Sequence, residues 1–134
     1  MTTIADILGS RRGTVISIGS TESVHDALVQ MEKHNVSALL VIDKEKLVGI
    51  VSEKDYARKV VLQGRTSKET KVSDIMVEHD RLLFATLKMT QQEAIMLMSE
   101  NQIRHLPVLD GKKKVVGVVS IRDFSFVADP EVEE

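Results

Sequence analysis

The amino-acid sequence predicts an α/β (α+β) protein made of two copies of one unit, each a short sheet with helices packed on one side. The main observation is an internal repeat. Residues 36–43 align with residues 103–110 at a shift of 67, and residues 49–56 align with residues 117–124 after one extra residue in the second turn. Apolar runs of strand length and apolar residues at helical spacing alternate within each copy, which favours a sheet covered by helices.

Each copy is predicted to begin with a short apolar segment that precedes its strands. Residues 4–8, before Gly9, have the spacing of a short helix with one apolar side, and residues 72–76 repeat the pattern at a shift of 68. Residues 15–18 and 82–85 are predicted to be short extended pieces. The duplication therefore includes the segments that come before each set of strands.

Two longer helices are predicted at equivalent places. The first begins within residues 21–24, where hydroxyl side chains can cap it, and carries Val24, Leu28 and Met31 at helical spacing. The second runs from Thr90 to Asn101 with a similar apolar stripe. Each helix is expected to end at an Asn or Gln just before a strand.

The copies differ most after their second strands. Residues 53–62 carry an apolar stripe that predicts a helix, and Gly64 is a natural C-terminal stop. The matching helix of the second copy, at residues 124–127, soon meets Pro130. The predicted boundaries are residues 1–64 for the first repeat, 65–71 for a polar linker, 72–128 for the second repeat and 129–134 for an acidic tail.

The second copy's strand pair carries the most functional information. Apolar runs at 106–109 and 115–119 flank a polar turn containing Gly111, which predicts a β-hairpin. The second strand leads into Ser120-x-x-Asp123. A hydroxyl three residues before a carboxylate can begin a helix, whose free N–H groups and dipole favour an anion. Taken alone, the motif is better explained as a capping arrangement.

Composition restricts the class of function. With 134 residues, 43% hydrophobic and 28% charged, the chain is predicted to be a stand-alone soluble unit, too short to combine a catalytic domain with a regulatory one. A net charge of −2 and 3% aromatic residues argue against binding to nucleic acid or membranes. The absence of cysteine excludes disulfides and thiol chemistry, and no signal segment or membrane span is evident. We expect a cytoplasmic protein.

Two in-register copies of an apolar strand ending in Asp, a turn, and then Gly-h-Val-Ser-x-x-Asp, with h apolar, resemble the paired domains named after cystathionine β-synthase, the CBS pair or Bateman module. The resemblance covers residues 4–126. It implies a pseudo-two-fold pair that binds an adenosine-containing ligand in the cleft between its repeats and reports the ligand's level to a partner, an enzyme or a transporter. The expected ligand is AMP, ADP or ATP, and less so NAD(H) or S-adenosylmethionine.

The resemblance also assigns candidate site residues. In it each Ser faces a phosphate and each Asp accepts both hydrogen bonds of a ribose diol, for which an ionised carboxylate is suited. The expected nucleotide-binding residues are Ser120, Arg122, Asp123, Arg104, His105 and Pro107 in the second repeat, and Ser52, Lys54, Asp55 and Ala38 in the first. Pro107 lacks an N–H, so its strand is expected to be irregular or at an edge there, with room for a base. The phosphate is expected mainly in the second repeat, because arginine forks suit it better than Ser37 and Lys54.

No catalytic or metal site is predicted. The four His residues are scattered without i, i+4 spacing, and no Ser has a base and an orienting acid in a recognisable order. The alternative function is a ligand-free module for protein interaction or dimerisation. A homodimer is expected in either case, through apolar residues on the helices that follow the two motifs: Tyr56, Val60, Val61, Phe124, Phe126 and Val127.

Overall fold

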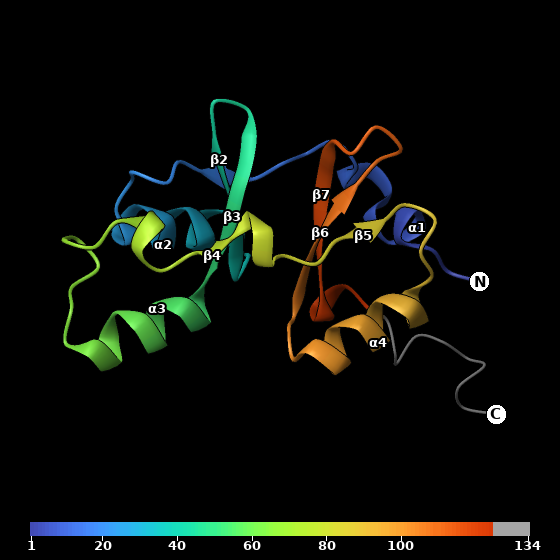
Figure 1. The fold of residues 1–134 in the computed structure, drawn as a ribbon. Helices are drawn as coiled ribbons and strands as arrows, with labels where there is room; N and C mark the ends of the chain where they lie inside the picture. The colour runs from blue at the N-terminus through green and yellow to red at the C-terminus, as the bar shows by residue number, and fades with distance from the viewer. Residues whose placement is uncertain (125–134) are drawn as a thin grey trace. The chain divides into compact units, whose positions relative to one another are not determined.

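A computed structural model describes residues 1–124, which form two compact units (Figure 1). The first unit comprises residues 15–82 and contains a four-stranded sheet. The second unit comprises residues 1–14 together with residues 83–124 of the described chain, and contains a three-stranded sheet. The predicted α/β class, with a duplicated set of strands and helices, is confirmed.

The sheet of the first unit has the strand order β1-β2-β3-β4, with β1 parallel to β2 and the other neighbours antiparallel. Its strands are β1 (Ser17–Ile18), β2 (Ala38–Asp43), β3 (Lys46–Ser52) and β4 (Val77–Glu78). Its helical segments are α2 (Val24–His34), α3 (Glu53–Lys59) and the 3₁₀ turns η2 (Val61–Gln63), η3 (Val72–Asp74) and η4 (His79–Arg81). Ala38 pairs with Ser52, so the end of β3 lies beside the start of β2.

The second unit repeats this arrangement in the order β5-β6-β7, with β5 parallel to β6 and β6 antiparallel to β7. Its strands are β5 (Ala85–Thr86), β6 (His105–Leu109) and β7 (Val115–Ser120). Its helical segments are α1 (Ile4–Leu8), α4 (Gln91–Asn101) and the 3₁₀ turns η1 (Gly9–Arg11) and η5 (Ile121–Asp123). The predicted hairpin is confirmed, and His105 pairs with Ser120 as Ala38 pairs with Ser52 in the first unit.

The two long helices begin and end where capping chemistry predicts. The Ser23 hydroxyl accepts a hydrogen bond from the Asp26 backbone N–H at 3.0 Å, at the start of α2. Thr90 caps α4 in the same way. Asn35 and Gln102 follow the helices in a left-handed conformation, each with a φ of 54°, and stop them.

Each repeat is preceded by what we call its leading segment: residues 4–13 and residues 72–81. These segments are exchanged. In the second unit the Ile4 N–H donates to the Met89 carbonyl oxygen at 2.8 Å, and in the first unit the Val72 N–H donates to the Glu22 carbonyl oxygen at 2.9 Å. The leading segment of the first repeat therefore belongs to the second unit, and that of the second repeat to the first unit. For this reason the compact units divide the chain at different places from the sequence repeats.

The glycine of each Gly-h-Val-Ser motif lies where a leading segment packs on the sheet. A Cβ on Gly49 would lie 2.5 Å from the Val77 carbonyl oxygen and 2.9 Å from the Met76 sulfur. A Cβ on Gly117 would lie 3.1 Å from the Leu8 Cδ2 atom. Close packing, rather than a positive φ, therefore favours glycine in this part of the motif, most strictly at Gly49, where the nearest atom belongs to the backbone.

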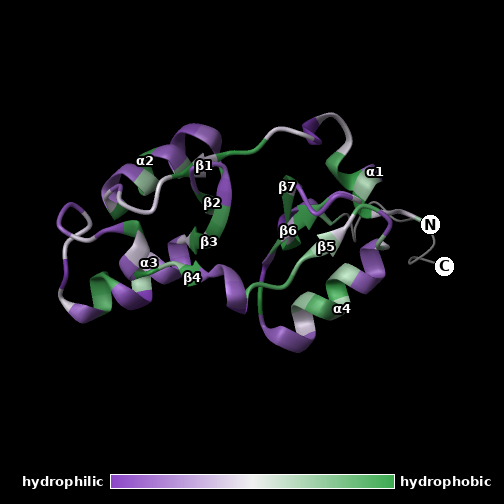
Figure 2. Cartoon of the chain, turned by 45° about the horizontal axis from the view of Figure 1, so that its top comes forward, coloured by the Kyte–Doolittle hydropathy of each residue, from purple (hydrophilic) through white to green (hydrophobic). Residues whose placement is uncertain are grey.

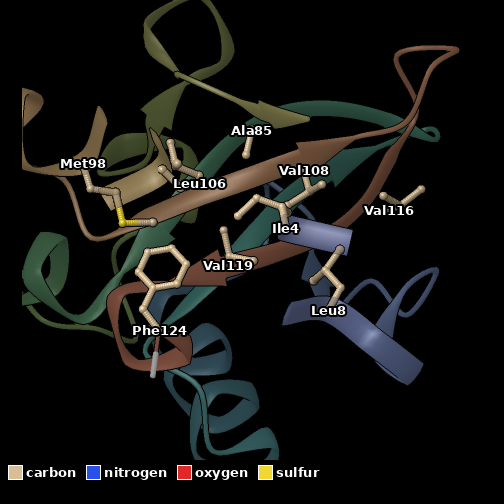
Figure 3. Packing of buried hydrophobic residues seen from close by; sticks show 10 residues of the cluster. Ile4, Leu8, Ala85, Met98, Leu106, Val108, Val116, Val119 and Phe124 are labelled. Carbon is tan, nitrogen blue, oxygen red and sulfur yellow. The ribbon is translucent and has the colours of Figure 1, made fainter. Parts of the chain in front are cut away.

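Each unit has its own hydrophobic core. Figure 2 shows the hydrophobic colour on the central strands β2, β3, β6 and β7, whereas the helices are mixed. In the second unit Ile4 and Leu8 of α1 lie in one cluster with Leu106, Val119 and Phe124 (Figure 3). The core of this unit therefore combines segments from the two ends of the described chain.

The polar residues 65–71 do more than join the two repeats. The Val24 N–H donates to the Thr70 carbonyl oxygen at 2.8 Å, and the His25 N–H donates to the Ser67 carbonyl oxygen at 3.0 Å. Both donors belong to the first turn of α2 and have no partner within the helix. The predicted linker therefore docks on the first unit and satisfies the start of its longest helix.

One predicted helix is shorter than expected, because residues 72–76 form only the 3₁₀ turn Val72–Asp74. The motif at Ser120 leads into the 3₁₀ turn Ile121–Asp123, and the helix predicted at residues 124–127 lies outside the described residues except for Phe124. Residues 125–134, which contain Phe126, Val127 and the predicted acidic tail, lie outside the described residues. Within residues 1–124, no helix is long and apolar enough to cross a bilayer.

The surface predicted for dimer contacts needs correction. Val60 and Phe124 are buried in the cores of the first and second unit, and Tyr56 packs against the first core. Val60 directly follows the last residue of α3, Lys59, and its side chain belongs to the same core cluster that Tyr56 packs against. The apolar side chains that stay exposed there are Val61 and Leu62, at 52% and 74% of their surface. The homodimer stays a prediction.

Candidate ligand-binding site at the Ser-x-x-Asp junctions

The motif of the second unit lies where β7 ends. The backbone N–H of Ser120 donates to Asp123 Oδ2 at 2.7 Å, so the chain itself fixes the orientation of this carboxylate. The Ile121 N–H donates to the Arg104 carbonyl oxygen at 2.9 Å, which joins the junction to the start of β6. The capping interpretation is therefore correct for Asp123, and it leaves the second carboxylate oxygen, Oδ1, to other partners.

That second oxygen contacts a cation from the leading segment. Arg11 Nη2 lies 3.3 Å from Asp123 Oδ1, and the two side chains are 49% and 23% exposed. Ion pairs with this much exposure contribute about 0–1 kcal/mol to stability. The guanidinium therefore neutralises the carboxylate. Its replacement by another group would change the stability of the fold only slightly.

The other residues expected in the second repeat surround this junction to different degrees. Arg104 and Arg122 are exposed, and within residues 1–124 neither makes an ion pair. His105 is half-buried on β6, directly across from Ser120. The structure thus places two available cations and an imidazole on the segments that adjoin Asp123.

Pro107 lies in the central strand of its sheet rather than in an edge strand. β5 pairs with β6 only at Val108 and Leu109, one position further on. In the first unit the equivalent residue, Leu40, uses its N–H to bond the Ile16 carbonyl oxygen at 3.4 Å. A proline has no N–H for such a bond. It is tolerated at residue 107 because the parallel pairing with β5 begins only at the next residue.

The first unit holds its motif carboxylate more tightly. The Ser52 N–H and hydroxyl donate to Asp55 Oδ2 at 2.9 and 3.0 Å, and the Asp55 N–H donates back to Ser52 Oγ at 3.3 Å. Lys59 Nζ lies 3.4 Å from Asp55 Oδ1 and also donates to the Ile75 carbonyl oxygen at 2.9 Å. Asp55 is therefore clamped by its own helix, and the same lysine ties that helix to the leading segment.

The remaining expected residues of the first repeat offer less to a phosphate. Lys54 is exposed on α3, and Ala38 is buried opposite Ser52. The turn after Ser120 has three residues and α3 has seven, so neither has the length of a helix with a substantial dipole. An anion at either junction would thus depend on side-chain cations, and the expected contribution of a helix N-terminus is small.

Sequence reasoning missed two residues that contact the motif carboxylates. Lys59 follows Asp55 at i+4, a spacing that places the two side chains on one helix face, so the sequence did contain a signal. Arg11 carries no such signal, because its contact with Asp123 depends on the exchange of the leading segments.

Two equivalent aspartates at the ends of β2 and β6 have separate structural functions. Asp43 accepts hydrogen bonds from the Ser20 hydroxyl and N–H, and these lower its pKa. Asp110 accepts from the backbone N–H groups of Lys114 and Lys112 in its own turn, which lower its pKa as well. Within the described part of the chain, no group of three or more His, Cys, Asp or Glu side chains could hold a metal ion.

Comparisons with known proteins agree with the duplicated architecture. A family model of the CBS domain matches residues 4–62 and again residues 72–128. The chain is 41% identical over 129 residues to the CBS domain-containing protein CBSX3, mitochondrial, of Arabidopsis thaliana, an alignment that covers 91% of this chain and 62% of that protein. The chain thus spans less than two thirds of that relative's length.

Solved structures give the same result. A CBS-domain protein from Burkholderia ambifaria MC40-6 superposes with a TM-score of 0.89 at 41% identity, covering 96% of each chain. The CBS domain pair of protein MJ0100, solved in complex with 5′-methylthioadenosine and S-adenosyl-L-methionine, gives a TM-score of 0.79 at 29% identity and covers 93% of this chain and 94% of that one. With two family matches in register with the two Ser-x-x-Asp junctions, the chain belongs to the CBS domain family and is a tandem CBS pair, a regulatory module.

Proposed function

We propose that this CBS pair binds an adenosine nucleotide and signals its level to a partner protein. The observation that carries the proposal is the Asp123 carboxylate, which is oriented by the Ser120 N–H, is 23% exposed and has an arginine 3.3 Å from its second oxygen. An ionised carboxylate accepts hydrogen bonds through both oxygens, which suits the paired hydroxyls of a ribose. The residues that we propose for this site are Ser120, Arg122, Asp123, Arg104, His105 and Pro107.

The charge around Asp123 favours AMP, ADP or ATP among adenosyl ligands. Arg11 contacts Asp123, and Arg104 and Arg122 on the adjoining segments are exposed and make no ion pair with any other residue of the range 1–124. Guanidinium groups bind phosphate through two parallel hydrogen bonds, whereas they repel the positive sulfonium of S-adenosylmethionine. The MJ0100 pair was solved with S-adenosyl-L-methionine and 5′-methylthioadenosine, which supports adenosyl recognition without deciding the substituent at the 5′ position.

The same residues support a binding role rather than catalysis. Each motif serine lies within its capping arrangement, beside a carboxylate that is paired with a cation. A nucleophilic serine needs a base that is free to take its proton, whereas the Asp55 carboxylate, which accepts the Ser52 hydroxyl, is held by the Ser52 N–H and by Lys59. We therefore propose that the chain is not an enzyme, and that it acts in the cytoplasm through a regulated enzyme or transporter.

A second candidate function is a protein-interaction module, and one observation favours it. Val61 and Leu62 are consecutive exposed residues on η2, and the basic residues Arg58 and Arg65 lie three positions from them in the sequence. An exposed apolar pair of this kind is suited to a contact with another chain, including a second copy in a homodimer. Light scattering of wild type and Leu62→Ser would test the dimer, since the variant should shift the mass toward the monomer.

A thermal-shift series tests the proposed function. A ligand at about a hundred times its dissociation constant stabilises a fold by about 2.7 kcal/mol, which is several degrees for a domain of this size. We expect AMP, ADP or ATP to give such a shift and S-adenosylmethionine or NAD to give less. Asp123→Asn is the matched control and should lose most of the shift. A flat response to all five compounds at millimolar concentration would leave the protein-interaction module as the better explanation.

A further inference from the structure

The second unit contains a cation that the motif does not include. We propose that Arg11 is a ligand-binding residue, which contacts the phosphate of an adenosine nucleotide and so makes this site prefer the nucleotide to the uncharged nucleoside. The inference rests on the proposed function, because it assumes that the ribose binds at Asp123. It adds a residue of the leading segment to those proposed to bind the phosphate. This residue would explain a preference for the nucleotide over the nucleoside.

The backbone holds Arg11 in place on both sides. Leu8 is buried, and its side chain lies where a Cβ on Gly117 would approach it to 3.1 Å. On the other side the Gly13 N–H donates to the Val116 carbonyl oxygen at 2.8 Å. The η1 turn is thus attached to β7 before and after Arg11. The guanidinium is therefore kept near the junction at the end of that strand.

The hydrogen bonds at Asp123 explain how the guanidinium becomes available to a phosphate. Oδ2 already accepts the Ser120 N–H at 2.7 Å, and Oδ1 is the atom that contacts Arg11 at 3.3 Å. A ribose diol that hydrogen-bonds this carboxylate must share Oδ1 or take it over. A half-exposed ion pair is exchanged at small cost. The displaced guanidinium keeps its charge and its N–H donors beside a sugar that carries the phosphate.

In the first unit the cation that contacts the motif carboxylate, Asp55, is a lysine and is less easily released. Lys59 contacts Asp55 Oδ1 but also donates to the Ile75 carbonyl oxygen at 2.9 Å, so its release would break a second contact. An ammonium is also a point charge, without the planar fork that binds two phosphate oxygens. The selectivity for phosphate that we propose is therefore a property of the second unit.

The adjacent residue Arg12 provides a matched control. It has the same charge, is exposed, and within residues 1–124 makes no ion pair. Isothermal titration should compare AMP and adenosine on wild type, Arg11→Ala, Arg11→Gln and Arg12→Ala. We expect Arg11→Ala to weaken AMP about tenfold while adenosine changes less than about twofold, because the lost hydrogen bond is to a charged group. Arg12→Ala should resemble wild type.

The outcomes separate this inference from the proposed function. If wild type binds neither AMP nor adenosine, the proposed function and the proposed role of Arg11 are both wrong. If wild type binds both and the ratio of their affinities is unchanged in the Arg11 variants, the role of Arg11 is wrong and the proposed function stands. Equal weakening of AMP and adenosine would also overturn it, since Arg11 would then only orient Asp123. Should Arg11→Ala fail to fold, Arg11→Gln carries the same expectation.

Discussion

The two Ser-x-x-Asp junctions share their backbone geometry and differ in the cation that each carboxylate contacts. In both, the N–H of the serine donates to Oδ2 of the aspartate, at 2.9 Å for Ser52 and 2.7 Å for Ser120. Asp55 is paired with Lys59 of its own helix, which also bonds the leading segment, whereas Asp123 is paired with Arg11 of the leading segment itself. The capping function is thus common to both repeats, and the two carboxylates differ in the cation that they contact and in exposure, which is 13% for Asp55 and 23% for Asp123.

The largest effect expected from this comparison concerns the two carboxylates. Asp123→Asn should weaken AMP and adenosine alike by roughly 10- to 100-fold, because a hydrogen bond to a charged group contributes about 1.5–3 kcal/mol. Asp55→Asn should have little effect on either ligand. Isothermal titration of both variants measures the difference. If Asp55→Asn abolished binding while Asp123→Asn did not, the first unit would hold the ligand and the comparison would be reversed.

The glycines of the two motifs allow a comparison in stability. Gly49→Ala should destabilise the protein by about 1–3 kcal/mol, because the new methyl group would collide with backbone, at 2.5 Å from the Val77 carbonyl oxygen. Gly117→Ala should cost less, since the close atom belongs to the movable Leu8 side chain. Urea denaturation of both variants gives the two values. Equal losses of stability would mean that the Leu8 side chain of α1 cannot move aside more easily than the backbone of β4.

These glycines show what local patterns can and cannot predict. The hairpin, the capped helices and the left-handed residues Asn35 and Gln102 were predictable because each depends on neighbours within a few positions. The motif glycines were recognised as part of a repeat, but their reason lies in an exchanged segment far away in the chain. The apolar stripes around Tyr56 and Phe124 were read as surfaces, because periodicity does not say which element covers them.

The candidate site divides in the same way. Ser120 and Asp123 were identified from a motif in the repeat, and the structure brings them into hydrogen-bond contact. Arg11 could not be identified, since a side-chain contact between distant segments has no local pattern. The sequence after Ser120 has the start signal of a helix, but within the described residues it forms only a three-residue turn. The helix dipole at this junction is therefore smaller than expected.

The two exposed arginines of the second repeat should act on the phosphate alone. Arg104→Ala and Arg122→Ala should each weaken AMP about tenfold and leave adenosine nearly unchanged, because a phosphate contact is worth about 1.5–3 kcal/mol in favourable geometry. Lys54→Ala, the equivalent of Arg122 in the first repeat, is the control and should bind AMP like wild type. Titrations of these variants would place the phosphate in the second repeat or exclude it from there.

The smallest expected effect compares the aspartates at the strand ends, Asp43 and Asp110. Hydrogen bonds lower the pKa of both carboxyls in the folded chain, so each contributes stability above its unfolded pKa of about 3.9, and that stability is lost as the pH falls through the lower folded value. The partner of Asp43 is Ser20, in another part of the fold, whereas Asp110 bonds the N–H groups of its own turn.

A local turn can persist in part in the unfolded chain, which reduces the difference between the folded and unfolded pKa. Asp43→Asn should therefore flatten the fall of the melting temperature between about pH 5 and pH 3 more than Asp110→Asn does. Melting curves of both variants across that range measure the two slopes. The argument fails if Asp110→Asn has the larger effect, since the turn of β6 and β7 would then form only with the rest of the fold.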